Sequence, residues 1–196
     1  MKIIFEDKNI VVLEKPIGLD SEREVPKELK EQLGGEFFCV HRLDKNVGGV
    51  MVYARNKKSA AMFSRLIAEN KMIKEYVAKV HGKPENSGVF EDFLFKDSRK
   101  NKVFVVKRER KGVKYAKLEY DVLKQFDDTS LVHIRLYTGR SHQIRVQFAS
   151  RGFPLVGDHK YGSRDKLTTP MLFSSKITFP YNNKIQSFET LPDWSE

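Results

Sequence analysis

The chain has 196 residues, 40% of them hydrophobic, and its 36 basic against 26 acidic residues give a net charge of +10. This length and hydrophobic fraction are enough for the core of one compact domain, and no apolar run approaches the roughly 18 residues that a membrane span needs. Cys39 is the only cysteine, which excludes an intrachain disulfide and a Cys-based zinc cluster.

The first 70 residues are predicted to form a hairpin, a helix, a third strand and a second helix. Pro16 and Gly18 end the hairpin, and Gly34-Gly35 ends the first helix. The N-terminal segment lacks the apolar core of a signal peptide, because charged residues interrupt it from Glu6 onward; a cytoplasmic protein is expected. In order, the predicted elements are strands Lys2–Phe5 and Ile10–Glu14, helix Pro26–Leu33, strand Val50–Ala54 and helix Ser59–Ala68.

The rest of the chain is predicted to be mostly β. Lys74–His81 alternates as a strand does, with Tyr76 on one of its faces. Ser141–Ser150 is the exception, a helix capped by Ser141 and ended at Gly152. The further predicted strands are Val89–Phe95, Lys102–Val106, Tyr115–Gln125, Ser130–Tyr137 and Leu172–Phe179. Many strands with few, scattered helices indicate an α+β fold rather than a doubly wound sheet.

The segment His41–Gly49 is the first candidate for chemistry. It places Asp44 two residues after Arg42, in a turn that leads into the predicted strand Val50–Ala54. A short acidic side chain at a strand end can be held rigidly and still face a substrate, and Gly48-Gly49 permit close approaches that bulkier residues forbid. On the residues alone, Asp44 could equally be a turn carboxylate that accepts from nearby backbone N–H groups.

A second polar cluster lies at the start of the predicted helix after residue 140. Arg140 and His142 near a helix N-terminus form a candidate anion site. Arg145 could reach a buried carboxylate, with Asp44 as the candidate partner, and such a pair would keep the acid ionised and aimed. A basic, solvated helix start is the open alternative. A hydrolase triad using Ser141 is disfavoured, because adjacent side chains on a helix diverge.

Tyr76 is the third candidate, since a tyrosine on a strand beside the site could stack on a base and offer its hydroxyl. Ordinary core packing is the open alternative. His81 and His133 fit strand positions better than ligand positions. Without an HExxH pattern or paired His and Cys residues, no metal site is expected.

Two basic runs, Arg99–Lys102 and Lys107–Lys111, flank the predicted strand Val103–Val106. On a hairpin they would form one basic rim with Phe104 between them. Such a rim contacts phosphates and contributes salt-dependent affinity without sequence discrimination. A solvated hairpin tip without a partner would have the same composition.

Taken in order, these segments resemble the RluA-type pseudouridine synthases, over about residues 3 to 180. The matching segments are Phe5–Leu19, His41–Asp44, Lys74–Gly82, Thr138–Val146 and Gly157–Gly162. The resemblance implies a pseudouridine synthase fold over 1–196: a single catalytic domain with a central, mostly antiparallel mixed sheet, flanking helices, and an active-site cleft between two lobes. It implies neither metal nor organic cofactor.

The resemblance also implies roles for individual residues. Asp44 would be the catalytic aspartate, Tyr76 the tyrosine against the target base, and Arg145 the arginine paired with Asp44. Arg42 would enter the RNA as the uridine leaves its stack. The residues expected to bind RNA are His41, Arg42, Arg140, His142, Gln143 and Lys160.

This sequence departs from the family pattern in three places. Val47-Gly48-Gly49 stands where Thr-Ser-Gly is usual, which removes two hydroxyls from the catalytic loop. Gln147 stands where a histidine is usual. The chain opens at the catalytic domain, so an S4 RNA-binding domain is not expected and the domain's own basic surface would have to bind the RNA.

The function expected is isomerisation of specific uridines in structured ribosomal or transfer RNA, by a cytoplasmic monomer with an RNA stem-loop as partner and no membrane. A catalytically inactive RNA-binding protein or RNA chaperone is the first alternative. A nucleoside glycosidase is the second, and it would need a further carboxylate, for which Glu75 and Asp158 are candidates. The target uridine and the detailed reaction path stay open.

Overall fold

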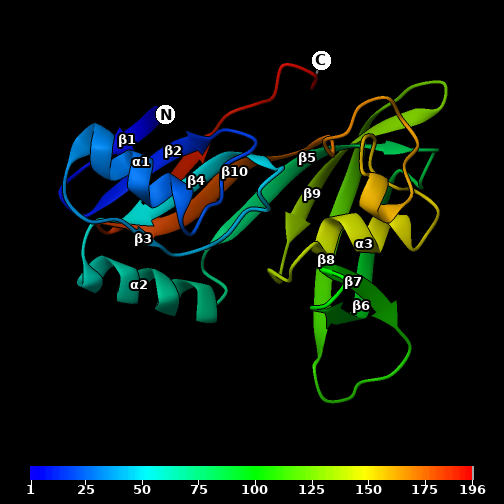
Figure 1. Ribbon diagram of the computed structural model, residues 1–196, viewed down its shortest axis with the longest axis horizontal. Helices are drawn as coiled ribbons and strands as arrows, with labels where there is room; N and C mark the ends of the chain where they lie inside the picture. The colour runs from blue at the N-terminus through cyan, green and yellow to red at the C-terminus, as the bar shows by residue number, and fades with distance from the viewer. Residues whose placement is uncertain (196) are drawn as a thin grey trace. The chain divides into compact units, whose positions relative to one another are not determined.

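The computed structural model describes residues 1–195, which form two compact units. Unit 1 comprises residues 1–75 and the chain from residue 173 onward, and unit 2 comprises residues 76–172. The chain passes from one unit to the other within two strands, β5 (Ile73–His81) and β10 (Leu172–Tyr181) (Figure 1).

Unit 1 is built on strands in the order β1-β2-β4-β10, with β3 pairing β4 and β11 pairing β10. β10 runs parallel to β4 and the other pairs are antiparallel, so the strand set is mixed. Its elements are β1 (Lys2–Glu6), β2 (Ile10–Lys15), α1 (Glu24–Leu33), β3 (Phe38–Cys39), β4 (Gly48–Ala54), α2 (Lys57–Ala68), β10 and β11 (Lys184–Glu189).

Helix α2 covers the apolar core of unit 1. It begins at Asn56, whose side chain accepts a hydrogen bond from the backbone N–H of Ser59 at 2.9 Å, as an N-cap residue does. Phe63 of α2 is fully buried and meets Phe179 of β10 edge to face, with ring centroids 5.0 Å apart. Every residue of β4 is buried, so this strand lies at the centre of the unit.

Unit 2 has the strand order β5-β9-β8-β6-β7, and the pairs from β9 to β7 are antiparallel. The aromatic rings of Phe90, Tyr120 and Phe148 pack together with centroids 4.8–5.3 Å apart, which anchors α3 to the sheet. Its elements are β5, β6 (Ser87–Asp97), β7 (Lys102–Val106), β8 (Val113–Gln125), β9 (Thr129–Leu136), α3 (Gln143–Ala149) and a 3-10 turn (His159–Tyr161).

The expected α+β class with a mostly antiparallel mixed sheet is confirmed by this arrangement. The expectation of one domain with a cleft between two lobes stays a prediction. Among the described residues, the longest helix has 12 residues, and no helix combines the length and apolar character that crossing a membrane requires.

The predicted start of α3 is wrong. Ser141 does not cap it: the helix begins at Gln143, after His142 in the left-handed conformation (φ 51°), and no side chain caps it. β3, the 3-10 turn and β11 were not predicted from the sequence. The turn before β11 carries a usable signal, because Asn182 and Asn183 both have positive φ, and asparagine tolerates that conformation in tight hairpin turns.

Candidate active site

Asp44 lies in the loop between β3 and β4 of unit 1 and is half-buried. The backbone N–H of Val47 donates to the Asp44 carbonyl at 2.9 Å, which closes a turn. After this turn, Gly48 and Gly49 pair with Phe173 and Ser174 of β10. The turn thus leads directly into the central strand β4, at the point where β4 pairs with β10.

The carbonyls on either side of Asp44 are also held by hydrogen bonds. The Leu43 carbonyl accepts from Ser21 Oγ at 3.0 Å. The Lys45 carbonyl accepts from the N–H of Gly18 at 2.8 Å and from Lys15 Nζ at 3.3 Å. Three consecutive peptide groups are therefore fixed, and the direction in which the Asp44 side chain leaves the backbone is fixed with them.

Lys15 is a further residue at this loop, and it was not among the residues predicted for the site. Its side chain is buried, and Nζ also donates to the carbonyls of Pro16 and Leu19 at 2.8 Å. Burial lowers the pKa of Lys15 to about 8, against the attraction of the Asp20 and Asp44 carboxylates. The only sequence signal was a lysine at the end of an apolar strand, before a Pro-x-Gly turn.

His41 joins the start of the motif to β4. Its Nε2 accepts a hydrogen bond from the N–H of Val52 at 3.2 Å, while Nδ1 is buried and has no partner among the described residues. Burial, with a smaller contribution from Lys74, lowers the pKa of His41 to about 3. A neutral ring in this position supports the loop, and the predicted contact of His41 with RNA stays a prediction.

Arg42 is half-exposed and forms an ion pair with Glu22, with 2.8 Å between Nη1 and Oε2. Both side chains are about half accessible to solvent. Exposed ion pairs of this kind contribute about 0–1 kcal/mol. Arg42 can therefore exchange Glu22 for another acceptor, such as a phosphate or a base, at little cost.

In unit 2, Arg145 forms a bidentate ion pair with Asp158. Nε and Nη2 donate to the two carboxylate oxygens at 2.7 and 2.8 Å, and both side chains are buried. The guanidinium also lies over the ring of Tyr161, 5.2 Å from its centroid. Asp44 belongs to unit 1, so its predicted pairing with Arg145 stays a prediction. The signal for Asp158 was its place in the matched segment Gly157–Gly162.

Polar residues at and just before the start of α3 hold the turn that precedes the helix. Gln143 is buried, and its Oε1 accepts from Thr138 Oγ1 at 2.8 Å and from the N–H of Arg140 at 3.1 Å. Arg140 Nε donates to the Tyr115 carbonyl at 2.8 Å. His142 Nδ1 lies 2.8 Å from the hydroxyl of Tyr161.

The other two predicted site residues of unit 2 lie on different elements. Tyr76 is buried in β5, with 5% of its surface exposed. Lys160 lies in the 3-10 turn, and its Nζ donates to the carbonyl of Asn101 at 3.0 Å. The structure thus brings Lys160 to the turn between β6 and β7, and the roles of Tyr76 and Lys160 toward RNA stay predictions.

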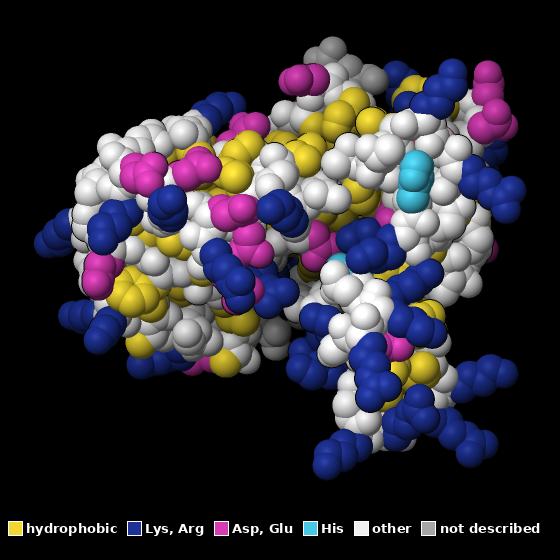
Figure 2. All heavy atoms as spheres, in the orientation of Figure 1, with side chains coloured by type: hydrophobic (Ala, Val, Ile, Leu, Met, Phe, Trp, Pro, Cys, Tyr) yellow, Lys and Arg dark blue, Asp and Glu magenta, His cyan; other side chains and the backbone are white. Residues whose placement is uncertain are grey.

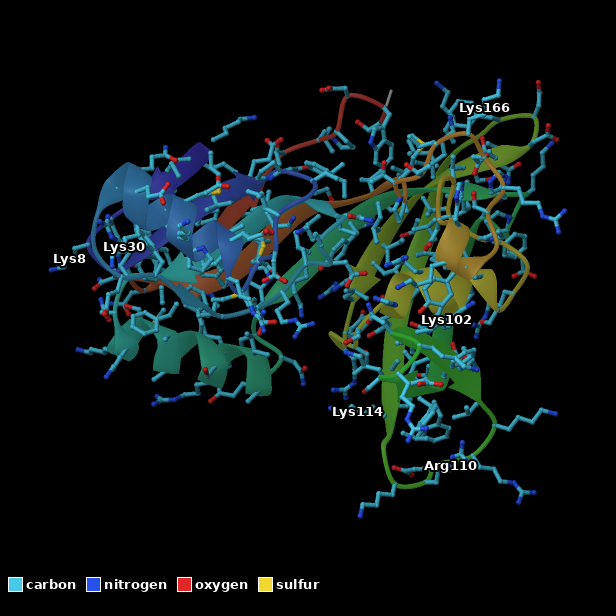
Figure 3. The ribbon with its side chains drawn as sticks, viewed as in Figure 1. Lys8, Lys30, Lys102, Arg110, Lys114 and Lys166 are labelled. Atoms are coloured by element: carbon cyan, nitrogen blue, oxygen red, sulfur yellow. The ribbon has the colours of Figure 1, made fainter. Side chains whose placement is uncertain are left out.

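Residues 98–114, here called the basic hairpin, extend over β7 and the turns on either side of it. They include one acidic residue, Glu109, and carry +7 of the net charge of +10. Lys and Arg side chains surround this end of unit 2 (Figure 2). Lys102, Arg110 and Lys114 are labelled on it in Figure 3. The basic residues are Arg99, Lys100, Lys102, Lys107, Arg108, Arg110, Lys111 and Lys114.

None of the side-chain ion pairs found within residues 1–195 involves a cation of the basic hairpin. Two of them lie near aromatic rings: Arg110 is 5.3 Å from the centroid of Phe95, and Lys102 is 5.8 Å from that of Phe104. Uncompensated positive charge beside exposed aromatic surface is typical of sites that bind the phosphates and bases of nucleic acids. In the part of the chain that is described, no cluster of three or more His, Cys, Asp or Glu could hold a metal ion.

A model of the family described as RNA pseudouridylate synthase matches residues 9–150. Ribosomal large subunit pseudouridine synthase D of Borreliella burgdorferi is 34% identical, covering 89% of this chain and 60% of that protein. Synthase C of Buchnera aphidicola is 31% identical, covering 94% of this chain and 65% of that protein. The chain thus spans about 60 to 65% of the length of these two relatives.

A relative named for transfer RNA is also similar: the mitochondrial tRNA pseudouridine(32) synthase of Saccharomyces cerevisiae is 34% identical, over 83% of this chain and 37% of that protein. Among solved structures, human RNA pseudouridylate synthase domain containing 1 superposes with a TM-score of 0.85 at 24% identity, over 97% of this chain and 83% of that chain. Human RNA pseudouridylate synthase domain containing 4 superposes with a TM-score of 0.83 at 25% identity, over 99% of this chain and 90% of that chain.

Proposed function

Because this chain belongs to the RNA pseudouridylate synthase family, we propose that it isomerises uridines in structured RNA to pseudouridine, with Asp44 as the catalytic residue. The observation that carries the proposal is the Asp44 loop. Consecutive carbonyls from Leu43 to Lys45 each accept a hydrogen bond, so the carboxylate is presented from a fixed backbone. Fixed geometry of this kind is what positions a catalytic group for a single reaction.

The proposed reaction breaks the N1–C1′ bond of uridine, turns the uracil, and forms a bond between C5 and C1′. N1 gains a proton and C5 loses one, so the reaction is balanced without any group added or removed. The protein needs to supply only positioning, charge and a route for one proton. Asp44 would act on the sugar or the base, and Tyr76 would hold the uracil and assist the proton transfer at C5.

The target uridine must leave its stack before Asp44 can reach it, which costs about a few kcal/mol. Arg42 is suited to fill the vacated space, because its exposed ion pair with Glu22 is weak. Arg145 is proposed as a further residue of the catalytic machinery, and Asp158 fixes its guanidinium by two short hydrogen bonds.

The substrate class proposed is ribosomal or transfer RNA, in keeping with the names of the relatives. The charge of the basic hairpin supports an RNA partner, since uncompensated cations release the counterions of a phosphate backbone. Contacts with phosphates bind RNA without discriminating between nucleotide sequences. The choice of uridine would then depend on the shape of the RNA around it.

The test is release of tritium from RNA whose uridines carry tritium at C5. We expect wild-type protein to release tritium, and Asp44→Asn to release none while binding the same RNA with an unchanged Kd, because the amide keeps the size of the side chain and loses its charge. Asp127→Asn is the matched control, since Asp127 is an exposed turn carboxylate. Wild-type turnover by Asp44→Asn would falsify the assignment.

Two other functions give different results in the same assay. A non-catalytic RNA-binding protein, which the hydroxyl-free Val47-Gly48-Gly49 segment favours, would bind RNA and release no tritium. A nucleoside glycosidase would release free uracil instead. It would need a second carboxylate that handles water, and Asp158 is already held by Arg145 on both oxygens.

A further inference from the structure

The loop that carries Asp44 has no side-chain hydroxyl after the aspartate, because Val47, Gly48 and Gly49 follow it. Its backbone carbonyls are therefore held by backbone N–H groups and by side chains from other segments. The Asp44 carbonyl accepts from within the loop, and the Lys45 carbonyl accepts from Gly18 and Lys15. The donor to the remaining carbonyl, that of Leu43, is a hydroxyl from another segment, Ser21 Oγ.

We propose that Ser21 and Tyr53 form a hydroxyl brace, a pair of positioning residues that holds the peptide group before Asp44. This inference rests on the proposed function only for its effect on turnover. Ser21 Oγ donates to the Leu43 carbonyl at 3.0 Å, and Tyr53 Oη donates to the Ser21 carbonyl at 2.8 Å. Tyr53 lies on β4, the strand into which the Asp44 loop leads.

The two hydrogen bonds form one connected path from β4 through Ser21 to the Leu43–Asp44 peptide. Tyr53 is fully buried and Ser21 is 3% exposed, so water does not compete for either hydroxyl. Ser21 is itself held in place, because Asp20 Oδ1 accepts from the N–H groups of Glu22 and Arg23 at 2.9 Å. The two hydrogen bonds therefore connect the Leu43 carbonyl to β4, and rotation of a single side chain cannot replace them.

A third donor supports the same loop from β3. The thiol of Cys39 lies beside Tyr53 and donates to the His41 carbonyl at 2.9 Å. Burial raises the pKa of the Cys39 thiol to about 11 and raises the pKa of the Tyr53 hydroxyl as well. Both groups thus keep their protons, and remain donors, across the neutral pH range.

The test separates positioning from stability with Ser21→Ala and Tyr53→Phe, which remove only the two hydroxyls. Ser21→Thr keeps a hydroxyl and should rescue the serine variant. Tyr181→Phe is the matched control: its hydroxyl is also buried in unit 1, but donates to Asp7 Oδ2 at 2.6 Å, in the β1–β2 turn. Two quantities are measured on each variant: hydrogen–deuterium exchange of peptides covering residues 41–50, and tritium release under single-turnover conditions, with protein in excess over RNA and above the Kd.

We expect faster exchange of the 41–50 segment in Ser21→Ala and Tyr53→Phe, and no change in Tyr181→Phe. The single-turnover rate should fall by about 10- to 100-fold with an unchanged Kd for RNA, since misplacement of a catalytic group by about 1 Å costs up to about 100-fold. The double variant should be no slower than the slower single variant, because both hydroxyls act through one carbonyl.

Exchange of the 41–50 segment at the wild-type rate in both variants would overturn the brace, whatever the activity. Equal loss of activity in Tyr181→Phe would show a general stability effect and overturn it too. If wild-type protein releases no tritium while the exchange results hold, the proposed function fails and the brace stands.

Discussion

At the scale of single residues, the charge state of His41 couples the Asp44 loop to pH. Burial lowers the pKa of His41 to about 3 from an ordinary value of 6.5. Between these two values the unfolded chain binds a proton at this residue and the folded protein does not. Stability from this residue is therefore complete above about pH 6.5 and is lost progressively as the pH falls toward 3.

We expect the free energy of unfolding, measured in urea, to fall between pH 7 and pH 4.5 with a slope of at most about 1.4 kcal/mol per pH unit from His41. His41→Gln can still accept from the N–H of Val52 but does not titrate, so its unfolding free energy should depend less on pH. The difference between the two curves of unfolding free energy against pH gives the contribution of His41, separate from that of the other histidines. Parallel curves for the two proteins would contradict a ring that stays neutral in the folded protein.

Arg42 gives a second prediction at this scale. Glu22→Gln removes its ion-pair partner and should strengthen RNA binding by up to about fivefold at low salt, because the free protein no longer holds the guanidinium. Glu36→Gln, an exposed glutamate in the same unit, controls for the change in net charge. If both variants lower the Kd for RNA equally, the effect comes from the change in net charge and does not depend on the ion pair between Glu22 and Arg42.

At the scale of elements, the join between β4 and β10 depends on one glycine. Gly49 has a φ of +119°, and a Cβ built on it would lie 2.3 Å from the carbonyl oxygen of Ser174. Both groups are backbone in a parallel strand pair, so neither can move aside as a side chain would. The pairing that anchors the Asp44 turn thus requires glycine here.

Gly49→Ala should lower the free energy of unfolding by about 2–3 kcal/mol more than Gly162→Ala does. Gly162 is the matched control because its φ is +106° and nothing lies within 4 Å of the added Cβ. Both variants share the cost of a positive φ, and only Gly49→Ala adds the collision. Urea unfolding midpoints measure the difference, and equal midpoints would show that β10 can move away from β4.

Sequence periodicity predicted the location of several elements but not where α3 begins. Alternating and helical periodicities located β5, α2 and the strands of unit 2, since these patterns reflect one buried face. They placed the start of α3 two residues too early, because Ser141 looks like a cap but His142 takes the left-handed conformation before the helix. Residues Gln143 to Phe148 are all buried, so tertiary packing decided where the helix begins.

At the scale of the whole molecule, most of the net charge is concentrated in the basic hairpin. If its cations contact RNA phosphates, replacing four of them with glutamine should reduce the slope of log K against log salt by about 3 to 4. The four are Lys107, Arg108, Arg110 and Lys111, which are exposed. Filter binding or fluorescence anisotropy, repeated at salt concentrations between about 50 and 300 mM, measures the slope.

A control with the same change in net charge uses exposed lysines of unit 1: Lys8, Lys30, Lys57 and Lys58. We expect this control to change the slope by less than about 1, because a long-range effect of net charge releases few counterions. Equal slopes for the two variants would show that the hairpin is a solvated surface without a specific partner.

The sequence by itself determined the α+β class, the position of the Asp44 motif and the basic hairpin, because each follows from residues that are neighbours along the chain. Only the tertiary structure decided that Lys15, Ser21 and Tyr53 hold the Asp44 loop, and that Asp158 is a partner of Arg145. A buried donor or cation needs a hydrogen-bond acceptor, but the sequence contains many residues that could provide one. The path of the backbone, fixed by packing of the whole unit, selects which of them are within reach.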